Sequence, residues 1–285
     1  MASSFPTPNR VTSRTQPCCV RKRLQKNRFA SAPCSPYPEP VEALSMKIPT
    51  IQGIISRRVL LNYRVDPEVA ANILPSPFRP KLHRGHAIAG ICLIRLEKIR
   101  PKGLPAALGI SSENSAHRIA VEWESENGEH SEGVFVPRRD TNARLNALAG
   151  GRVFPGVHSL SRFEVQDDEQ GISIRVSHPK ECALLLEFSA EEADSLPTGS
   201  IFESFEESSQ FFEGGCLGYS TRPDSCELDG LELRIDEWKA SPLSIRHVRS
   251  SFYDDRSLFP EGSIAFDHAL LMRNIPHEWH SLPRM

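Results

Sequence analysis

Short apolar segments with strand character, separated by turn signals, constrain the fold of this 285-residue chain more than any other feature. Residues 117–124 alternate apolar and polar side chains, Asn127-Gly128 is a strong hairpin signal, and residues 133–136 form a return strand that we expect Pro137 to stop. Similar apolar runs between turn residues predict strands at 59–65, 87–96, 162–166, 172–177, 182–189, 231–240, 243–251 and 264–272.

Two segments carry helix signals. Asp66-Pro67 supplies an N-cap and a first-turn proline for a helix at 68–74. Ser204-Phe-Glu-Glu207 is a capping-box pattern ahead of a helix at 205–213. Because strands outnumber helices, we expect an α+β, mainly antiparallel β fold: a curled sheet or β-barrel with a few short helices, in a single domain over 46–285.

The composition excludes several classes of protein. The longest apolar run, residues 87–94, is too short to span a bilayer and ends at Arg95, so we expect no transmembrane helix and no membrane partner. The formal net charge of -2 argues against nucleic-acid binding. Seven cysteines without a Cys-x-x-Cys pair indicate reduced, mostly buried thiols, which predicts a cytoplasmic protein.

Residues 1–45 differ in character from the rest of the chain. They are rich in Ser, Pro and Arg, hold seven Lys and Arg residues against two acids, and show no apolar periodicity. Such a segment cannot bury enough surface to offset its ordering entropy, so we predict a disordered basic tail. Two other interpretations stay open: an organelle transit peptide, which would share this composition, or a chain whose true start is Met46.

Residues 134–156 reverse the sign of the local charge. Four arginines stand there against one acid: Arg138, Arg139, Arg144 and Arg152, with Asp140. A guanidinium fork binds carboxylate or phosphate in two-point fashion, so this cluster at the end of an apolar strand predicts a binding site for a small anion. Asp140 and Asn146 would orient the arginines. The alternative is a solvated surface turn with scattered ion pairs.

Two histidines accompany this stretch and could transfer a proton in a common cavity. His117 shares a strand face with Ile119 and Val121, and His158 follows the arginines. His117 could equally be a satisfied core histidine. Phosphate-loop, dinucleotide-binding and nucleophile-elbow signatures are absent, and the histidines of His277-Glu-Trp-His280 are three apart rather than four, so we expect no cofactor and no metal.

Six stretches carry a resemblance to a known family. They are Val59-Leu-Leu-Asn-Tyr-Arg-Val-Asp66, Ser115-Ala-His-Arg-Ile-Ala-Val-Glu-Trp123, Val136-Pro-Arg-Arg-Asp-Thr141, Gly151-Arg-Val-Phe-Pro-Gly156, Ser250-Ser-Phe-Tyr-Asp-Asp255 and Phe266-Asp-His-Ala-Leu-Leu-Met-Arg273. In this order they resemble the YqjF-like bacterial proteins of unknown function, in the acetoacetate decarboxylase-like superfamily, over residues 48–280. The resemblance implies a curled antiparallel β-barrel with a central cavity and a few packed helices.

The resemblance raises the question of a Schiff-base lysine. Acetoacetate decarboxylase uses a lysine whose pKa is lowered by a cationic neighbour and an apolar site. The corresponding region here begins near Pro137, yet no lysine occurs between Lys102 and Lys180. Arginine cannot form the imine, because it stays protonated. We therefore expect a barrel that binds a small anionic carboxylate ligand through its arginine cluster, without the Schiff-base lysine.

Other functions stay open from the sequence. The chain could be a decarboxylase or other lyase that takes its lysine from another position, such as Lys81, Lys98 or Lys239. It could also be a non-catalytic scaffold module whose arginines pair with Asp254, Asp255 or Glu122. An enzyme without an imine would be of lyase or hydrolase type and would act on a small carboxylate. Homo-oligomer formation is compatible with all of these.

Overall fold

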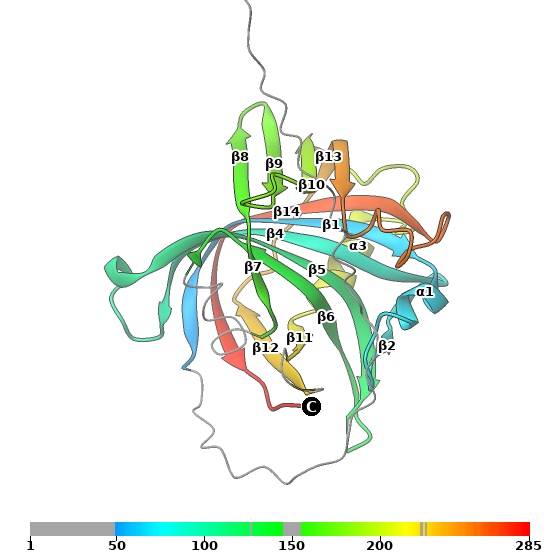
Figure 1. The fold of residues 1–285 in the computed structure, drawn as a ribbon, viewed down its shortest axis with the longest axis horizontal. Helices are drawn as coiled ribbons and strands as arrows, with labels where there is room; N and C mark the ends of the chain where they lie inside the picture. Colours follow the sequence, from blue (N-terminus) through cyan, green and yellow to red (C-terminus); the bar gives the residue numbers. More distant parts are fainter. Residues whose placement is uncertain (1–48, 126, 145–154, 223–224, 226) are drawn as a thin grey trace, which may run out of the picture. The chain divides into compact units, whose positions relative to one another are not determined.

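Four long antiparallel strands lie side by side at the centre of the fold (Figure 1). In order across the sheet they are β14 (Ile264–Ser281), β1 (Ile51–Val65), β4 (His86–Pro101) and β5 (Ile110–Glu124). The structure is a computed structural model that describes residues 49–285 except 126, 145–154, 223–224 and 226. These residues belong to one compact unit, Glu42–Met285.

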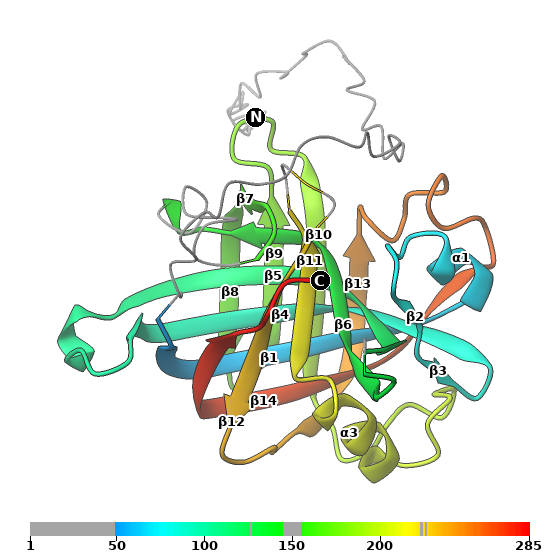
Figure 2. The same cartoon turned by 90° about the horizontal axis from the view of Figure 1, so that it is seen from below.

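The long strands are part of a closed ring. β5 pairs with β6 (His130–Thr141), β6 runs parallel to β11 (Leu217–Thr221), and β11 pairs with β12 (Leu228–Ile235). β12 pairs in turn with the last residues of β14, which returns the ring to β1. Figure 2 shows β6, β11 and β12 in front of the long strands.

A second group of strands extends from the other half of β14. β14 pairs there with β13 (Ser241–Ser250), and β10 (Leu184–Glu192), β9 (Gly171–Ser177) and β8 (Arg162–Asp168) follow in order. The remaining described elements are short: α1 (Pro67–Ala71), β2 (Arg79–Pro80), β3 (Leu82–His83), η1 (Ala106–Leu108), β7 (His158–Leu160) and α3 (Phe205–Glu213).

Both faces of the long strands are buried, and each face has its own apolar core. One core joins Leu61 and Ile119 to Phe188 of the second strand group. The other lies on the inner side of the ring, where Leu60 belongs to the same cluster as Phe212 of α3. Each fully buried side chain of this size contributes about 1.5–3 kcal/mol. Double burial explains why β4 reads as one continuous apolar run.

The expected mainly antiparallel sheet with few helices is confirmed. Both predicted helices form beside their caps. The Asp66 carboxylate accepts the backbone N–H of Glu68 at 2.9 Å, and Ser204 Oγ accepts that of Glu207 at 3.1 Å. Most strands extend beyond the predicted runs. β14, for example, continues through His277, because pairing with β1 and β12 holds this polar segment extended.

The expectation that Pro137 ends its strand is wrong. β6 continues through this residue, and its register with β5 shifts there. Ile119 faces Phe135 whereas His117 faces Arg138, so two residues of β6 stand opposite one of β5. Such a bulge accepts a proline, which has no backbone N–H to give to the ladder. The two arginines that follow are therefore extended strand residues and not part of a loop.

None of the described helices is long and apolar enough to cross a membrane.

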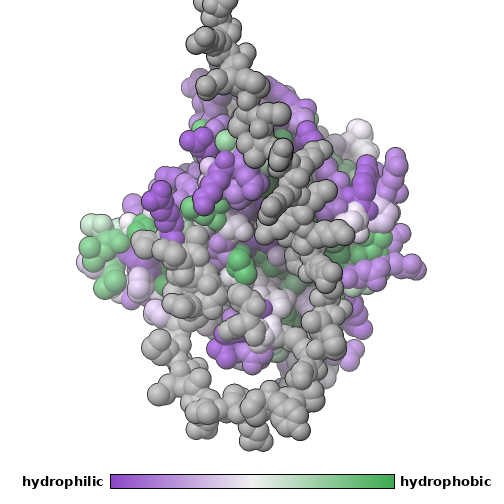
Figure 3. All heavy atoms as spheres, viewed as in Figure 1, coloured by the Kyte–Doolittle hydropathy of each residue, from purple (hydrophilic) through white to green (hydrophobic). Residues whose placement is uncertain are grey.

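An exposed apolar tip completes the fold. The connection between β4 and β5 projects beyond the ring, where Leu104, Leu108 and Ile110 are exposed, and Figure 3 shows apolar surface at that tip.

Candidate functional site

A cavity of about 160 Å³ lies inside the ring, and every ring strand contributes to its lining. Its walls are mostly apolar, and its charged lining consists of three arginines and one acid. The lining residues are Arg58, Cys92, Ile94, Leu96, Ile99, Asn114, Ser115, Ala116, Arg118, Val134, Val136, Arg139, Asp140, His158, Cys216, Gly218, Leu231, Leu233 and Trp279.

The three arginines leave donors unpaired inside the protein. Arg58 stands on β1, Arg118 on β5 and Arg139 on β6. The Nε atoms of all three, and Nη1 of Arg58, are buried without a hydrogen-bond acceptor among the described residues. Leaving a buried donor unpaired costs about 1–3 kcal/mol, more for a charged group. The described residues alone therefore do not satisfy this cluster.

Arg118 reaches across β4 to bind Asn62 on β1. Gly90 lies between them in the register, facing Asn62 on one side and Arg118 on the other. Arg118 Nη2 donates to Asn62 Oδ1 at 2.5 Å, and its guanidinium lies 4.8 Å from the ring centroid of Phe212. A Cβ on Gly90 would meet the Leu61 carbonyl oxygen at 2.5 Å and Arg118 Nη2 at 3.3 Å. Glycine is therefore required beneath the guanidinium.

Parallel pairing of β7 with β6 places His158 opposite Arg139. Arg139 Nη2 donates to Ser220 Oγ on β11 at 3.2 Å. Burial, followed by the positive charge of Arg139, lowers the pKa of His158 to about 4, so its imidazole is neutral at pH 7. A neutral imidazole beside a fixed cation can accept a proton from a bound molecule.

The cavity is cationic at neutral pH. Burial lowers the pKa of Arg118 and of Arg139 to about 10, yet both stay protonated at pH 7. The only acid in the described lining, Asp140, is already engaged: it accepts from Arg138 Nε at 3.1 Å and Nη2 at 3.2 Å and from two serines. A ligand anion would relieve the cost of holding these buried charges.

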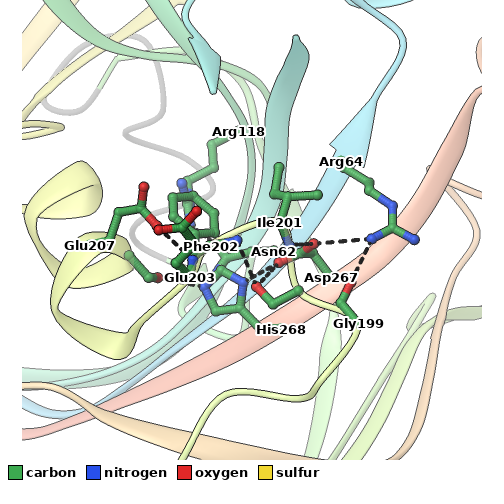
Figure 4. A network of polar contacts seen from close by, with 12 residues as sticks. Asn62, Arg64, Arg118, Gly199, Ile201, Phe202, Glu203, Glu207, Asp267 and His268 are labelled. Atoms are coloured by element: carbon green, nitrogen blue, oxygen red, sulfur yellow. Dashed lines mark hydrogen bonds and ion pairs between the residues drawn. The ribbon is translucent and has the colours of Figure 1, made fainter. Parts of the chain in front are cut away.

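A buried chain of hydrogen bonds runs from Arg118 through Asn62 and His268 to Asp267 (Figure 4). His268 Nδ1 lies 2.6 Å from Asp267 Oδ1, and its Nε2 lies 3.1 Å from Asn62 Nδ2 and 2.7 Å from Ser208 Oγ. Arg118 can only donate, so the amide oxygen of Asn62 faces it and the NH₂ group faces His268. His268 Nε2 must then accept, which assigns the neutral tautomer with its proton on Nδ1.

A bulge in β14 makes this chain of hydrogen bonds. The register with β1 shifts between Asn62 and Tyr63, which leaves Asp267 as an additional residue. In a regular strand, Asp267 and His268 would point to opposite faces. Burial alone would raise the pKa of Asp267, but hydrogen bonds from His268, Ser200 and a backbone N–H outweigh it and hold the pKa below its ordinary value.

The structure separates the predicted ligand-binding residues. Arg139 lines the cavity, whereas its neighbour Arg138 faces His117 in the register and pairs with Asp140. Arg144 is exposed. Two further predicted residues, Asn146 and Arg152, lie outside the described residues. Of the three arginines of the sequence cluster that the structure describes, Arg139 is the one in the cavity lining.

His117 lies on the opposite face of β5 from the cavity-lining Ala116 and Arg118. It is 1 % exposed, its Nε2 lies 3.3 Å from Ser250 Oγ, and the Phe252 ring centroid is 4.8 Å away. Burial, followed by the charge of Arg138, lowers the pKa of His117 to about 3. The structure therefore does not bring the two predicted catalytic histidines, His117 and His158, to one cavity.

Sequence reasoning missed Arg58 and Arg118. Strand alternation places Arg118 on the face opposite His117, as observed, and the structure buries this face as well. A usable signal was present, since Arg118 stands between apolar residues of a buried strand. Arginine is almost never fully buried unless it is paired.

Residues 55–257 match the family model DUF2071, described as uncharacterized conserved protein (COG2071). No curated protein matches the chain by sequence. Acetoacetate decarboxylase from Legionella pneumophila has a similar structure, with a TM-score of 0.55 and 12 % identity over 90 % of this chain and 94 % of that one. An acetoacetate decarboxylase-like enzyme from Sphingomonas wittichii RW1 gives 0.53 and 12 % over 84 % and 93 %.

A third similar structure is the enduracididine biosynthesis enzyme MppR complexed with pyruvate, with a TM-score of 0.53 and 12 % identity over 84 % of this chain and 91 % of that one. At such identity the likeness shows the fold alone, and this acetoacetate decarboxylase-like fold agrees with the curled sheet that the sequence resemblance implied. Because the family model covers most of the chain, this protein belongs to the DUF2071 family of uncharacterized conserved proteins and has an acetoacetate decarboxylase-like fold.

Proposed function

We propose that the cavity inside the ring binds a small carboxylate through Arg58, Arg118 and Arg139. The observation that carries this proposal is a set of buried guanidinium nitrogens around one cavity that find no acceptor in the described part of the chain. Hydrogen bonds between charged partners contribute about 1.5–3 kcal/mol each. A carboxylate would pair these donors and offset the desolvation that lowers the pKa of Arg118 and Arg139.

The cavity walls indicate the size and polarity of the remainder of the ligand. Ile94, Val136 and Leu233 surround the arginines with apolar surface, and the volume of about 160 Å³ suits a molecule of a few carbons. MppR, which has a similar fold, is described in complex with pyruvate, itself a small carboxylate. We take this as support for the ligand class only. Cysteine usage supports a cytoplasmic site of action.

His158 is the group we propose for proton transfer if the bound carboxylate reacts. Its imidazole lines the cavity and is neutral at pH 7, so it can act as a base beside a substrate held by Arg139. The described lining contains no lysine, which favours a reaction of lyase or hydrolase type without an imine. Binding alone, without catalysis, would use the same arginines.

The test is thermal stabilisation of the full chain by a panel of small carboxylates. A ligand at one hundred times its Kd adds about 2.7 kcal/mol of stability, a rise in Tm of about 5–10 °C for a domain of this size. Arg139→Gln should weaken the best ligand at least about tenfold, the loss of one charge-assisted bond. Amides of the same acids should give no shift.

The matched control is Arg175→Gln. Arg175 is exposed on β9 and pairs with Glu187 at 2.6 Å, away from the cavity lining. We expect this variant to bind the ligand as the wild type does. If no carboxylate in the panel raises Tm, or if Arg175→Gln and Arg139→Gln weaken binding equally, the proposed site is wrong.

One observation favours a second candidate, an imine-forming lyase using Lys81. Lys81 lines a small cavity of about 30 Å³ together with Arg58 and Arg118, and cationic neighbours can activate a lysine. Its ammonium is, however, 2.6 Å from a Glu132 carboxylate oxygen. Lys98 and Lys239 are exposed. Borohydride reduction in the presence of acetoacetate decides the matter: a stable adduct on Lys81 would establish the imine, and an unlabelled chain would exclude it.

A non-catalytic scaffold role predicts arginines saturated by carboxylates. Arg138 fits that description through Asp140. Within the described residues, Arg58, Arg118 and Arg139 have no such ion pair, and the acids named for that role contact other groups: Asp254 pairs with Arg249, and Glu122 pairs with Arg79. The ligand panel separates the two functions, because a scaffold would show no carboxylate-specific stabilisation.

A further inference from the structure

Cys92 stands on the wall of the arginine cavity. It faces Leu60 of β1 on one side and Ala116 of β5 on the other, and Ala116 in turn faces Arg139 of β6. Neighbouring strands lie about 4.8 Å apart, so only the methyl group of Ala116 separates the thiol from the base of Arg139. Cys92 is 9 % exposed and belongs to the cavity lining.

Two guanidinium groups lie within electrostatic range of this thiol. Arg118 stands two residues along β5 from Ala116, on the same face, and is 5 % exposed with its Nε unpaired among the described residues. Burial lowers the pKa of Arg118 and of Arg139 to about 10, so both guanidinium groups keep their charge at pH 7. Two cations therefore stand near the sulfur, one buried (Arg118) and one half-buried (Arg139).

Cys92 packs in the apolar core on the inner side of the ring, but it also lines the cavity, which a purely structural cysteine does not. A buried structural thiol is surrounded by apolar side chains and is inert, whereas reactive cysteines lie beside Arg, Lys or His⁺ with access to a ligand. Cys92 combines both cationic neighbours and an open cavity with the guanidinium donors that would hold a carboxylate. The thiol and the anion site are therefore parts of one space.

We propose that Cys92 is a nucleophile toward small carboxylates that carry an electrophilic carbon, in the first place α,β-unsaturated acids. This inference rests on the proposed function, because the same arginines would hold the carboxylate. In the step, the thiolate sulfur forms a bond to Cβ and the carbon–carbon π pair moves to Cα. Cα then takes up one proton, equal to the one that the thiol released. The net change is addition of S–H across the double bond, and the carboxylate is unchanged.

The test compares two alkylating reagents that share a leaving group but differ in charge, iodoacetate and iodoacetamide. In both reactions a sulfur–carbon bond forms and iodide leaves. Rates at each cysteine of the full chain are followed by peptide mass spectrometry. Cys182, which is exposed and outside the cavity, is the internal reference. We expect the iodoacetate-to-iodoacetamide rate ratio at Cys92 to exceed that at Cys182 by about tenfold or more.

Variants and a competitor sharpen this result. Arg118→Gln and Arg139→Gln should each lower the ratio at Cys92, and Arg175→Gln should leave it unchanged. A non-electrophilic acid, propionate, should slow the iodoacetate reaction at Cys92 and not at Cys182. If a cavity variant fails to fold, the rate ratio at Cys92 of the wild-type protein still tests the proposal. Equal ratios at the two cysteines, or a Cys92 that neither reagent modifies, would overturn the proposal.

Fumarate tests the acceptor class directly. We expect a thioether adduct at Cys92 ahead of Cys182, and its absence would overturn the assignment to α,β-unsaturated acids. Failure of this inference is distinguishable from failure of the proposed function. Carboxylates that raise Tm while Cys92 stays unmodified would leave the binding site standing. If Cys92 instead prefers iodoacetate strongly while no carboxylate raises Tm, the nucleophile would stand and the proposed binding function would fail.

Discussion

Gly90 is the residue on which the geometry of the cationic cavity most depends. It occupies the one position of β4 that lies between Asn62 and Arg118, and the Arg118 guanidinium passes over it. Any side chain there meets a neighbouring backbone carbonyl at 2.5 Å, which a rotamer change cannot avoid. The strand pair would have to separate, and the bond between Arg118 and Asn62 would be displaced with it.

We therefore predict that Gly90→Ala lowers the free energy of unfolding by about 1–3 kcal/mol, the usual cost of overpacking a core. It should also abolish the ligand-dependent increase in the free energy of unfolding. Urea unfolding with and without ligand measures both effects. Gly199→Ala is the matched control, since a Cβ on Gly199 has no atom within 4 Å, and its effect should stay within about 0.5 kcal/mol. Equal effects of the two substitutions would contradict this account.

Single residues also show how far the sequence could predict the site. Arg139 and His158 were found because local charge and position along the chain both pointed to them. Arg58 and Arg118 were not, because they come from distant strands and meet only when the ring closes. Arg138 looked equivalent to Arg139, yet adjacent strand residues point to opposite faces, and this one pairs with Asp140.

At the scale of elements, irregularities decide which side chains meet. The bulge at Pro137 keeps β6 extended, and the bulge at Asp267 turns this carboxylate toward His268. Helix caps were predictable because their signals are local. The parallel pair of β6 and β11 was not, since it joins segments about 80 residues apart, and Gly218 faces Val134 there without any local turn signal.

Helix α3 allows a test of the N-cap that the sequence predicts at Ser204. Ser204 Oγ accepts the backbone N–H of Glu207 at 3.1 Å, and Phe212 at the far end of the helix packs on Arg118. Ser204→Ala should lower the free energy of unfolding by about 1 kcal/mol, because one helix N–H loses its acceptor. Ser204→Asp should restore it, since aspartate caps as well as serine. The urea midpoint measures both, and an unaffected Ser204→Ala variant would contradict the cap assignment.

The whole molecule buries histidines in neutral form on both faces of its central strands. Burial, with nearby arginine charge as a further cause, lowers the pKa of His117 to about 3 and of His158 to about 4. Burial is also the largest cause for His277, whose pKa falls to about 4 against an opposing backbone hydrogen bond. Each histidine has an ordinary pKa near 6.5 once the chain unfolds. The raised pKa of Glu113, caused by burial, acts in the opposite direction.

The sign of the resulting pH dependence follows from proton counting. Between pH 6.5 and 4 these histidines bind protons in the unfolded chain but not in the native chain. Their contribution to the free energy of unfolding is therefore fully present above pH 6.5 and is lost as the pH decreases. Each such histidine contributes at most about 1.4 kcal/mol per pH unit in this window, and three of them outweigh one glutamate. We predict a marked fall in the urea midpoint between pH 7.5 and 5.0.

Substitutions identify the histidines responsible for this fall. His277→Asn should make the decline shallower, because an amide does not bind a proton in either the native or the unfolded chain at these pH values. His247→Asn should leave the slope unchanged, since the His247 side chain is 52 % exposed and does not lose its contact with water on folding. A midpoint that stays constant from pH 7.5 to 5.0, or an equal change of slope in both variants, would mean that the buried histidines accept protons without loss of the fold. The two cores would then have to admit water at acidic pH, which the full burial of His117 argues against.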